Sequence, residues 1–133
     1  MREILFKAKN CAGKWAQGLL AHKDNKWYIS NIAGMPFAYE VRPENICQYT
    51  GLTDKNGNKI WENDIVKVEE HAPYVNGLYK VIYCETSCNY ALIRNNFTHG
   101  YFSFSDLNGF ETTSEVIGNI FDNPELLEGS GEE

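Results

Sequence analysis

Two cysteines, Cys84 and Cys88, are separated by three residues, a spacing that zinc ligands tolerate. His71 or His99 would have to complete the ligand set, because the chain has no second closely spaced cysteine pair. Unpaired cysteines are among the residues that proteins bury most often. We therefore expect four free, mostly buried thiols and no cofactor, and we leave zinc as an open alternative.

Two short segments contain acidic residues that are typical of calcium-binding loops or of glycosidase active sites. Asp54 with Asn56-Gly57 resembles the start of a calcium loop, but the later ligands and the closing glutamate are missing, and a hairpin turn accounts for these residues. Glu62 and Asp64 alternate as a glycosidase pair can, and the same spacing arises from one face of a strand. We predict no catalytic residues; an enzyme of unknown reaction is the minor alternative.

Aromatic residues are dense in the last third of the chain. An exposed aromatic face on a small barrel can stack nucleic-acid bases. Only Arg94 and His99 are nearby as cations, which makes a poor electrostatic groove, so that a core or a subunit interface is favoured. The members of this set are Phe97, Tyr101, Phe102, Phe104 and Phe110.

Length and composition favour one small globular protein. The chain has 133 residues, of which 43% are hydrophobic and 14% aromatic, enough for a packed core. No apolar run approaches the ~20 residues that span a bilayer, and residues 1–4 are not followed by the apolar segment of a signal peptide. We therefore expect a protein of the cytoplasm that does not bind membranes.

The charge balance is acidic. The chain has 18 acidic and 12 basic residues, for a net charge of -6, and part of the excess lies in the tail from Glu125 to Glu133. Duplex binding usually requires a basic stripe that neutralises phosphates, and none is visible in the sequence. This balance weighs against nucleic acid as a partner.

Short alternating segments separated by turn residues predict a mainly β fold with around ten strands, as in a closed barrel or a sandwich. The polar tip Lys23-Asp24-Asn25 is typical of a hairpin between two of them. The predicted strands are residues 2–9, 15–20, 26–29, 37–41, 64–68, 78–83, 90–94, 101–104 and 115–120, with a further hairpin over 48–61.

The hairpin over 48–61 has the clearest local signal. Asn56-Gly57 supplies two residues that tolerate positive φ, which is the requirement of a tight hairpin turn. Near the end of the chain, Asn123 can cap a helix and Pro124 suits its first position. We expect one short helical turn there, followed by a flexible acidic tail over residues 128–133.

Several segments, taken together, resemble the YopX family of phage and prophage proteins. The resemblance implies a mostly β cytoplasmic protein whose later half is a small SH3-like barrel entered at residues 64–66; the family has no established activity, so no catalytic residue is carried over. The family pattern has Gly before Asp64, where this chain has Asn63, and both residues accept positive φ. The segments that carry the resemblance are residues 2–8, 48–57, 60–66 and 115–127.

The fold expected is therefore a single β domain over residues 1–127, or two lobes over about 1–46 and 47–127, with an N-terminal β-hairpin region followed by the SH3-like barrel. The function expected is a non-enzymatic binding or assembly module that forms a homo-oligomer or holds a phage or host protein. A nucleic-acid-associated protein of phage replication or regulation is the alternative. The candidate binding surface, chosen from the recognisable segments, consists of Tyr49, Trp61, Asp64 and Asn119.

Overall fold

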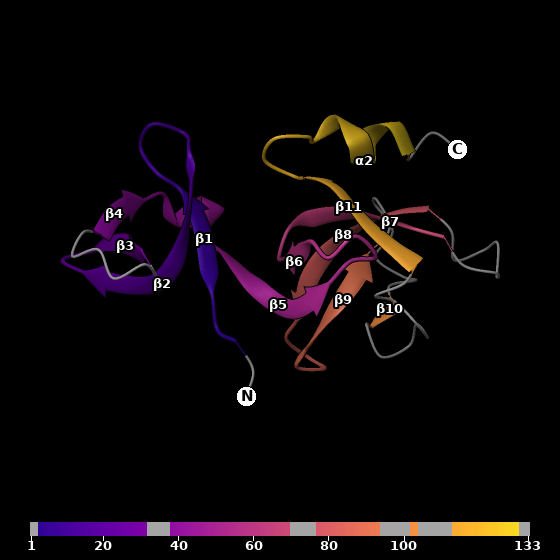
Figure 1. The fold of residues 1–133 in the computed structure, drawn as a ribbon, viewed down its shortest axis with the longest axis horizontal. Helices are drawn as coiled ribbons and strands as arrows, with labels where there is room; N and C mark the ends of the chain where they lie inside the picture. Colours follow the sequence, from indigo (N-terminus) through magenta and orange to yellow (C-terminus); the bar gives the residue numbers. More distant parts are fainter. Residues whose placement is uncertain (1–2, 32–37, 70–76, 94–101, 104–112, 131–133) are drawn as a thin grey trace. The chain divides into compact units, whose positions relative to one another are not determined.

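The computed structural model describes residues 3–31, 38–69, 77–93, 102–103 and 113–130 (Figure 1). These residues confirm the mainly β prediction, since the described elements are short strands apart from one 3-10 helix and one short α-helix. The elements are β1 (Phe6–Lys9), β2 (Trp15–Lys23), β3 (Lys26–Asn31), β4 (Ala38–Val41), η1 (Pro43–Asn45), β5 (Cys47–Thr53), β6 (Lys59–Trp61), β7 (Asp64–Val68), β8 (Gly77–Cys84), β9 (Asn89–Ile93), β10 (Phe102–Ser103), β11 (Ser114–Asn119) and α2 (Glu125–Ser130).

The chain forms two compact units, residues 1–51 and 52–133, and the boundary lies within β5. The first part of β5 pairs with β1, and beyond the boundary the chain turns into β6. Each unit has its own buried cluster of apolar side chains.

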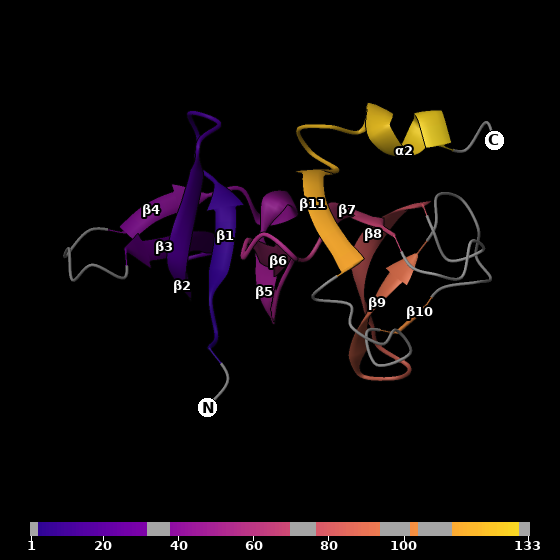
Figure 2. The ribbon, with the colours of Figure 1, turned by 45° about the vertical axis from the view of Figure 1, so that its right-hand side comes forward.

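The sheet of the N-terminal unit curls around a small core. Strands β1 to β4 pair in the order β4-β3-β2-β1 and are drawn in indigo and purple in Figure 2. An isolated bridge joins Asn10 to Val41, and the N–H of Arg42 donates to the carbonyl of Lys9 at 3.0 Å, so the end of β4 returns to the end of β1. The inward positions Ala8, Ile29 and Val41 form the core.

The hairpin between β2 and β3 follows directly from its sequence. Asp24 and Asn25 have φ values of 54° and 65°. Two successive residues with positive φ match the right-handed twist of the flanking strands, and short polar side chains tolerate this conformation best. The predicted hairpin tip is confirmed.

The C-terminal unit contains a five-stranded antiparallel sheet in the order β10-β9-β8-β7-β11. Pairings among the described residues do not close this sheet into a barrel, so the SH3-like detail stays a prediction. Ile60 of β6 packs with side chains of this sheet in one buried apolar cluster, whose other members are Val66, Val68, Tyr79, Val81 and Leu92.

The predicted hairpin from β5 into β6 is confirmed, but only one of its two turn residues has a positive φ. Gly57 has a φ of 83°, whereas Asn56 keeps a negative φ. The N–H of Gly57 donates to the carbonyl of Asp54 at 3.0 Å, and the N–H of Asp54 donates to the carbonyl of Asn58 at 2.8 Å. This is a three-residue loop with glycine in the left-handed position, which leaves the Asp54 carboxylate inside the loop.

The C-terminal helix is longer than predicted. Helix α2 extends to Ser130, so residues 128–130 of the predicted tail are helical, and 131–133 lie outside the described residues. The side chain of Asn123 accepts a hydrogen bond from the N–H of Asn119 at 3.3 Å and does not cap the helix. In the described part of the chain, no helix is long and apolar enough to cross a membrane.

Candidate functional site

Asp54, which was considered above as a possible calcium ligand, accepts hydrogen bonds from backbone N–H groups. Its side chain is 3% exposed. Oδ1 accepts hydrogen bonds from the N–H groups of Asn56 and Asn58, both at 2.9 Å. Oδ2 accepts one from the N–H of Val116 at 2.8 Å, on β11. Both carboxylate oxygens are therefore used to hold the loop to the last strand.

The ionisation of Asp54 reflects two opposed effects. Burial by itself raises the pKa of this carboxyl, because it disfavours the charged form. Hydrogen bonds from the N–H groups of Val116, Asn58 and Asn56, and from the side chain of Asn58, lower the pKa and outweigh burial. The net pKa lies below the ordinary value, so Asp54 is ionised at neutral pH.

The turn between β6 and β7 is organised by a second buried carboxylate. Asp64 is 2% exposed, and its Oδ2 accepts a hydrogen bond from the N–H of Trp61 at 2.8 Å. Asn63 has a φ of 69°, as its place in the turn predicts. The N–H of Asn63 donates to the carbonyl of Val81 at 2.8 Å, and its carbonyl accepts from the N–H of Ile120 at 3.0 Å.

Asn119 organises the turn that follows β11. Its Oδ1 accepts hydrogen bonds from the N–H groups of Phe121 and Asp122, both at 2.9 Å, and its Nδ2 donates to the carboxylate of Asp122 at 3.1 Å. A Cβ atom added at Gly118 would lie 2.5 Å from Oδ1 of Asn123. Glycine therefore lets the turn fold back against β11.

The candidate binding residues separate by burial. Tyr49, Trp61 and Asp64 are at most 8% exposed, and Asn119 is half-buried. In the C-terminal unit Asp64 is the register partner of Asn119 and bonds the backbone of Trp61, so the structure brings these three together. Tyr49 belongs to the N-terminal unit, where its N–H donates to the carbonyl of Leu5 at 2.8 Å. Burial favours roles in folding over a solvent-facing surface.

The cysteines do not follow the burial predicted for them. All four are free, but only Cys47 is buried; Cys11 and Cys88 are exposed and Cys84 is half-buried. Cys84 ends β8, and Cys88 is the last residue of the exposed four-residue turn over 85–88, where solvent contact costs a small thiol little. Within the residues that the structure describes, no group of three or more metal-binding side chains gathers. His71, His99 and most of the late aromatic set lie outside those residues.

A surface that the sequence analysis missed lies on the outside of the curled N-terminal sheet. Because Ala8 points inward, Lys7 and Lys9 point outward, beside their register partners Gln17 and Trp15. The ammonium nitrogens of Lys7 and Lys9 lie 4.6 and 5.4 Å from the centroid of the Trp15 ring. Both distances are within the range of a cation–π interaction.

Further outward positions continue this surface along β2 and β3. Leu19 is 56% exposed, and Lys23 and Lys26 are register partners at the hairpin tip. Lys26 also lies 3.8 Å from the carboxylate of Glu40. We call this surface the outward face; its members are Lys7, Lys9, Trp15, Gln17, Leu19, Ala21, Lys23, Lys26, Tyr28, Ser30, Ala38 and Glu40.

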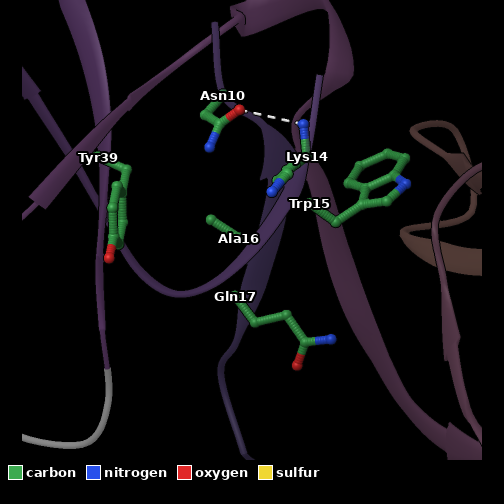
Figure 3. A pocket seen from close by; sticks show the side chains of 6 residues that line it. All are labelled: Asn10, Lys14, Trp15, Ala16, Gln17 and Tyr39. Carbon is green, nitrogen blue, oxygen red and sulfur yellow. Dashed lines mark hydrogen bonds between the residues drawn. The ribbon is translucent and has the colours of Figure 1, made fainter. Parts of the chain in front are cut away.

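An open hollow of about 400 Å³ lies beside β2 (Figure 3). One wall is the turn in which Oδ1 of Asn10 accepts a hydrogen bond from the N–H of Lys14 at 3.0 Å. Trp15 and Gln17 extend away from Tyr39, so the two aromatic rings do not face each other across it (Figure 3). The hollow is therefore not a shared aromatic pocket.

The two units differ in charge. Residues 1–51 contain seven basic and four acidic residues, a net charge of +3, whereas residues 52–133 contain five basic and fourteen acidic residues, a net charge of -9. The whole-chain balance hid this difference. Counting the charge of each predicted lobe would have revealed it.

Comparisons with known proteins agree with the fold. No curated protein matches the chain. The crystal structure of protein EF1440 from Enterococcus faecalis is similar with a TM-score of 0.52 and 19% sequence identity, covering 96% of this chain and 99% of that one. At this identity the likeness shows the fold alone. The family model described as YopX protein matches residues 7–128, which cover most of each unit, and the chain therefore belongs to the YopX family.

Proposed function

We propose that this protein is a non-enzymatic binding and assembly module of a phage or prophage, acting in the host cytoplasm, and that the outward face is its contact surface. The observation that carries the proposal is the placement of Lys7 and Lys9 over the ring of Trp15 on a solvent-facing sheet. Contact between the ring and the ammonium groups holds two long side chains in place before a partner arrives, which lowers the entropy lost on binding.

The polar residues that are the strongest candidates for catalysis support this assignment, because their side chains have structural roles. The side chains of Asp54, Asp64 and Asn119 all accept hydrogen bonds from backbone N–H groups of the C-terminal unit. Their polar atoms hold turns together, as buried polar groups must be paired. A reaction mechanism built on them would break those turns.

Exposed apolar side chains add contact area in the N-terminal unit. Leu19 and Tyr39 are 56% and 48% exposed, and Ile4, before β1, is 54% exposed. Scattered apolar side chains are normal on a surface, but Leu19 lies on the same outward face as Trp15, Tyr28 and the lysines. That combination is typical of protein interfaces. A second copy of the chain and a phage or host protein both fit it.

A specific observation also favours the second candidate function, association with nucleic acid. The N-terminal unit has a net charge of +3, and its outward face carries Lys7, Lys9, Lys23 and Lys26. Local charge of this sign attracts phosphates even when the whole chain is acidic.

Light scattering coupled to size exclusion tests the assembly role in the full chain. We expect a mass above that of one chain, which falls in the double variant Trp15→Ala, Leu19→Ser. The matched control Tyr83→Ala, Ile117→Ser removes two exposed apolar side chains from the C-terminal unit and should leave the mass unchanged. A single-chain mass at every concentration would contradict self-association.

A further inference from the structure

We infer that the outward face binds single-stranded nucleic acid, with its lysines on the phosphates and its aromatic rings against the bases. The inference rests on the proposed function and names the class of partner. The proposed partner is a flexible polyanion that carries flat aromatic rings. The alternative partner, which the experiment below distinguishes, is an acidic protein surface.

The first argument is the concentration of like charge. Lys23 and Lys26 lie directly opposite each other across β2 and β3, a pairing of like charges that destabilises a sheet. Lys7 and Lys9 are two residues apart on the same face of β1. Among the described outward positions of β1 to β4, Glu40 is the acidic side chain. The single carboxylate of Glu40 offsets little of the repulsion among these lysines, and a bound polyanion would relieve it.

The second argument is the length of the charged track. Strand β2 runs from Trp15, beside the first lysine pair, to Lys23, within the second. At about 3.4 Å per residue the track extends up to roughly 27 Å. This matches the shorter of the sites, about 4 to 16 nucleotides long, that single strands occupy on small β folds.

The third argument is the chemistry between the lysines. Trp15 and the half-buried Tyr28 lie on the outward face, with the amide of Gln17 and the hydroxyl of Ser30. Aromatic rings stack on bases of any sequence, and lysine binds phosphate as a point charge. An acidic polypeptide offers the charge but not the rings. The outside of a curled sheet also suits a strand that can bend over it.

The test is the fluorescence anisotropy of a labelled mixed-sequence DNA single strand of about 15 nucleotides titrated with the full chain. Affinity should fall linearly with salt on a log–log scale between about 50 and 200 mM, with a slope of roughly -3 for four phosphate contacts. The variant Lys7→Gln, Lys9→Gln should flatten that slope by about 1.4. Trp15→Ala should weaken binding about tenfold, and Trp15→Phe should restore most of it.

The matched control is Lys67→Gln, Lys80→Gln, which removes the same charge from β7 and β8 in the C-terminal unit and should leave the slope unchanged. Circular dichroism checks that each variant is folded. An absence of binding at the lowest salt, or a slope that the Lys7 and Lys9 changes leave unaltered, overturns the inference. Equal competition by polyglutamate of the same charge overturns it in favour of an acidic protein.

The two proposals fail separately. Light scattering measures self-association, and anisotropy measures binding of the single strand. An oligomer that depends on Trp15 and Leu19 but does not bind DNA would retain the assembly role and remove the nucleic-acid inference. A monomer that binds DNA through Lys7 and Lys9 would do the reverse.

Discussion

The carboxylate of Asp54 accepts a hydrogen bond from the N–H of Val116, a residue 62 positions further along the chain, at 2.8 Å. One residue on, the N–H of Lys55 donates to the carbonyl of Ser114 at 3.0 Å. These two bonds satisfy edge groups of β11 that a neighbouring strand would otherwise pair. The hairpin loop thus protects one side of the last strand, and such edges are templates for unwanted pairing when left open.

Replacing Asp54 should destabilise the protein. Asp54→Asn places an amide N–H where a backbone N–H needs an acceptor, and we expect a loss of about 1–3 kcal/mol in the free energy of unfolding by urea. The control is Asp24→Asn, in an exposed turn whose positive φ asparagine adopts equally well, and it should change little. Equal stability of both variants would show that the bond to Val116 is not a significant contribution.

The contribution of Asp54 should depend on pH. Its folded pKa lies below the value of 3.8 for a free aspartate, so its stabilisation is complete above that value and is lost as the pH falls toward the folded pKa. The difference in unfolding free energy between the natural protein and Asp54→Asn should therefore be constant from neutral pH down to about 5 and shrink below 4. A difference that grows on acidification would contradict a lowered pKa.

Gly118 and Asn123 should be energetically coupled. Gly118→Ala forces a Cβ to within 2.5 Å of Oδ1 and 3.0 Å of Cβ of Asn123, so we expect a loss of about 1–3 kcal/mol. In an Asn123→Gly background the same change should cost less, and a double-mutant cycle measures the difference. Gly57→Ala is the comparison: its Cβ has open space, so its cost comes from a φ of 83° and is independent of Asn123.

Removing the hydroxyl of Ser114 should not weaken the fold. The side chain is fully buried, and its Oγ has no hydrogen-bond partner among the described residues, while the backbone carbonyl accepts from Lys55 in any variant. Ser114→Ala removes an unpaired buried group, and we expect unchanged stability or a gain of up to about 1 kcal/mol in urea unfolding. Ser114→Val, which adds volume, should lose stability instead.

Local features were predictable from the chain alone. The alternation of side chains, the tip at Asp24-Asn25 and the positive φ of Asn63 depend on residues that are neighbours in sequence, and all three are present in the structure. The hairpin at 54–58 was predicted, but its three-residue loop was not, because Asn56-Gly57 is compatible with more than one loop length.

The roles of the candidate residues were not predictable in the same way. Asp54 was considered as a calcium ligand, and Asp64 and Asn119 were chosen as candidate binding residues from the recognisable segments. Only the antiparallel register of β7 and β11 puts Asp64 beside Asn119. Their hydrogen-bond partners are backbone groups, which no side-chain pattern encodes. The residue types therefore suggested binding or catalytic roles, whereas in the structure these side chains stabilise turns and a strand edge.

The sequence by itself determined a mainly β chain, its turns and its membership of the YopX family, because these depend on short-range dihedral preferences and on the order of recognisable segments. Only the tertiary structure decided which side chains share one solvent-facing side of a sheet. The outward face needs the pairing of β1 with β2, which places Lys7 and Lys9 over the ring of Trp15. This arrangement depends on chain segments that meet in space, and the alternation of side chains along one strand does not specify it.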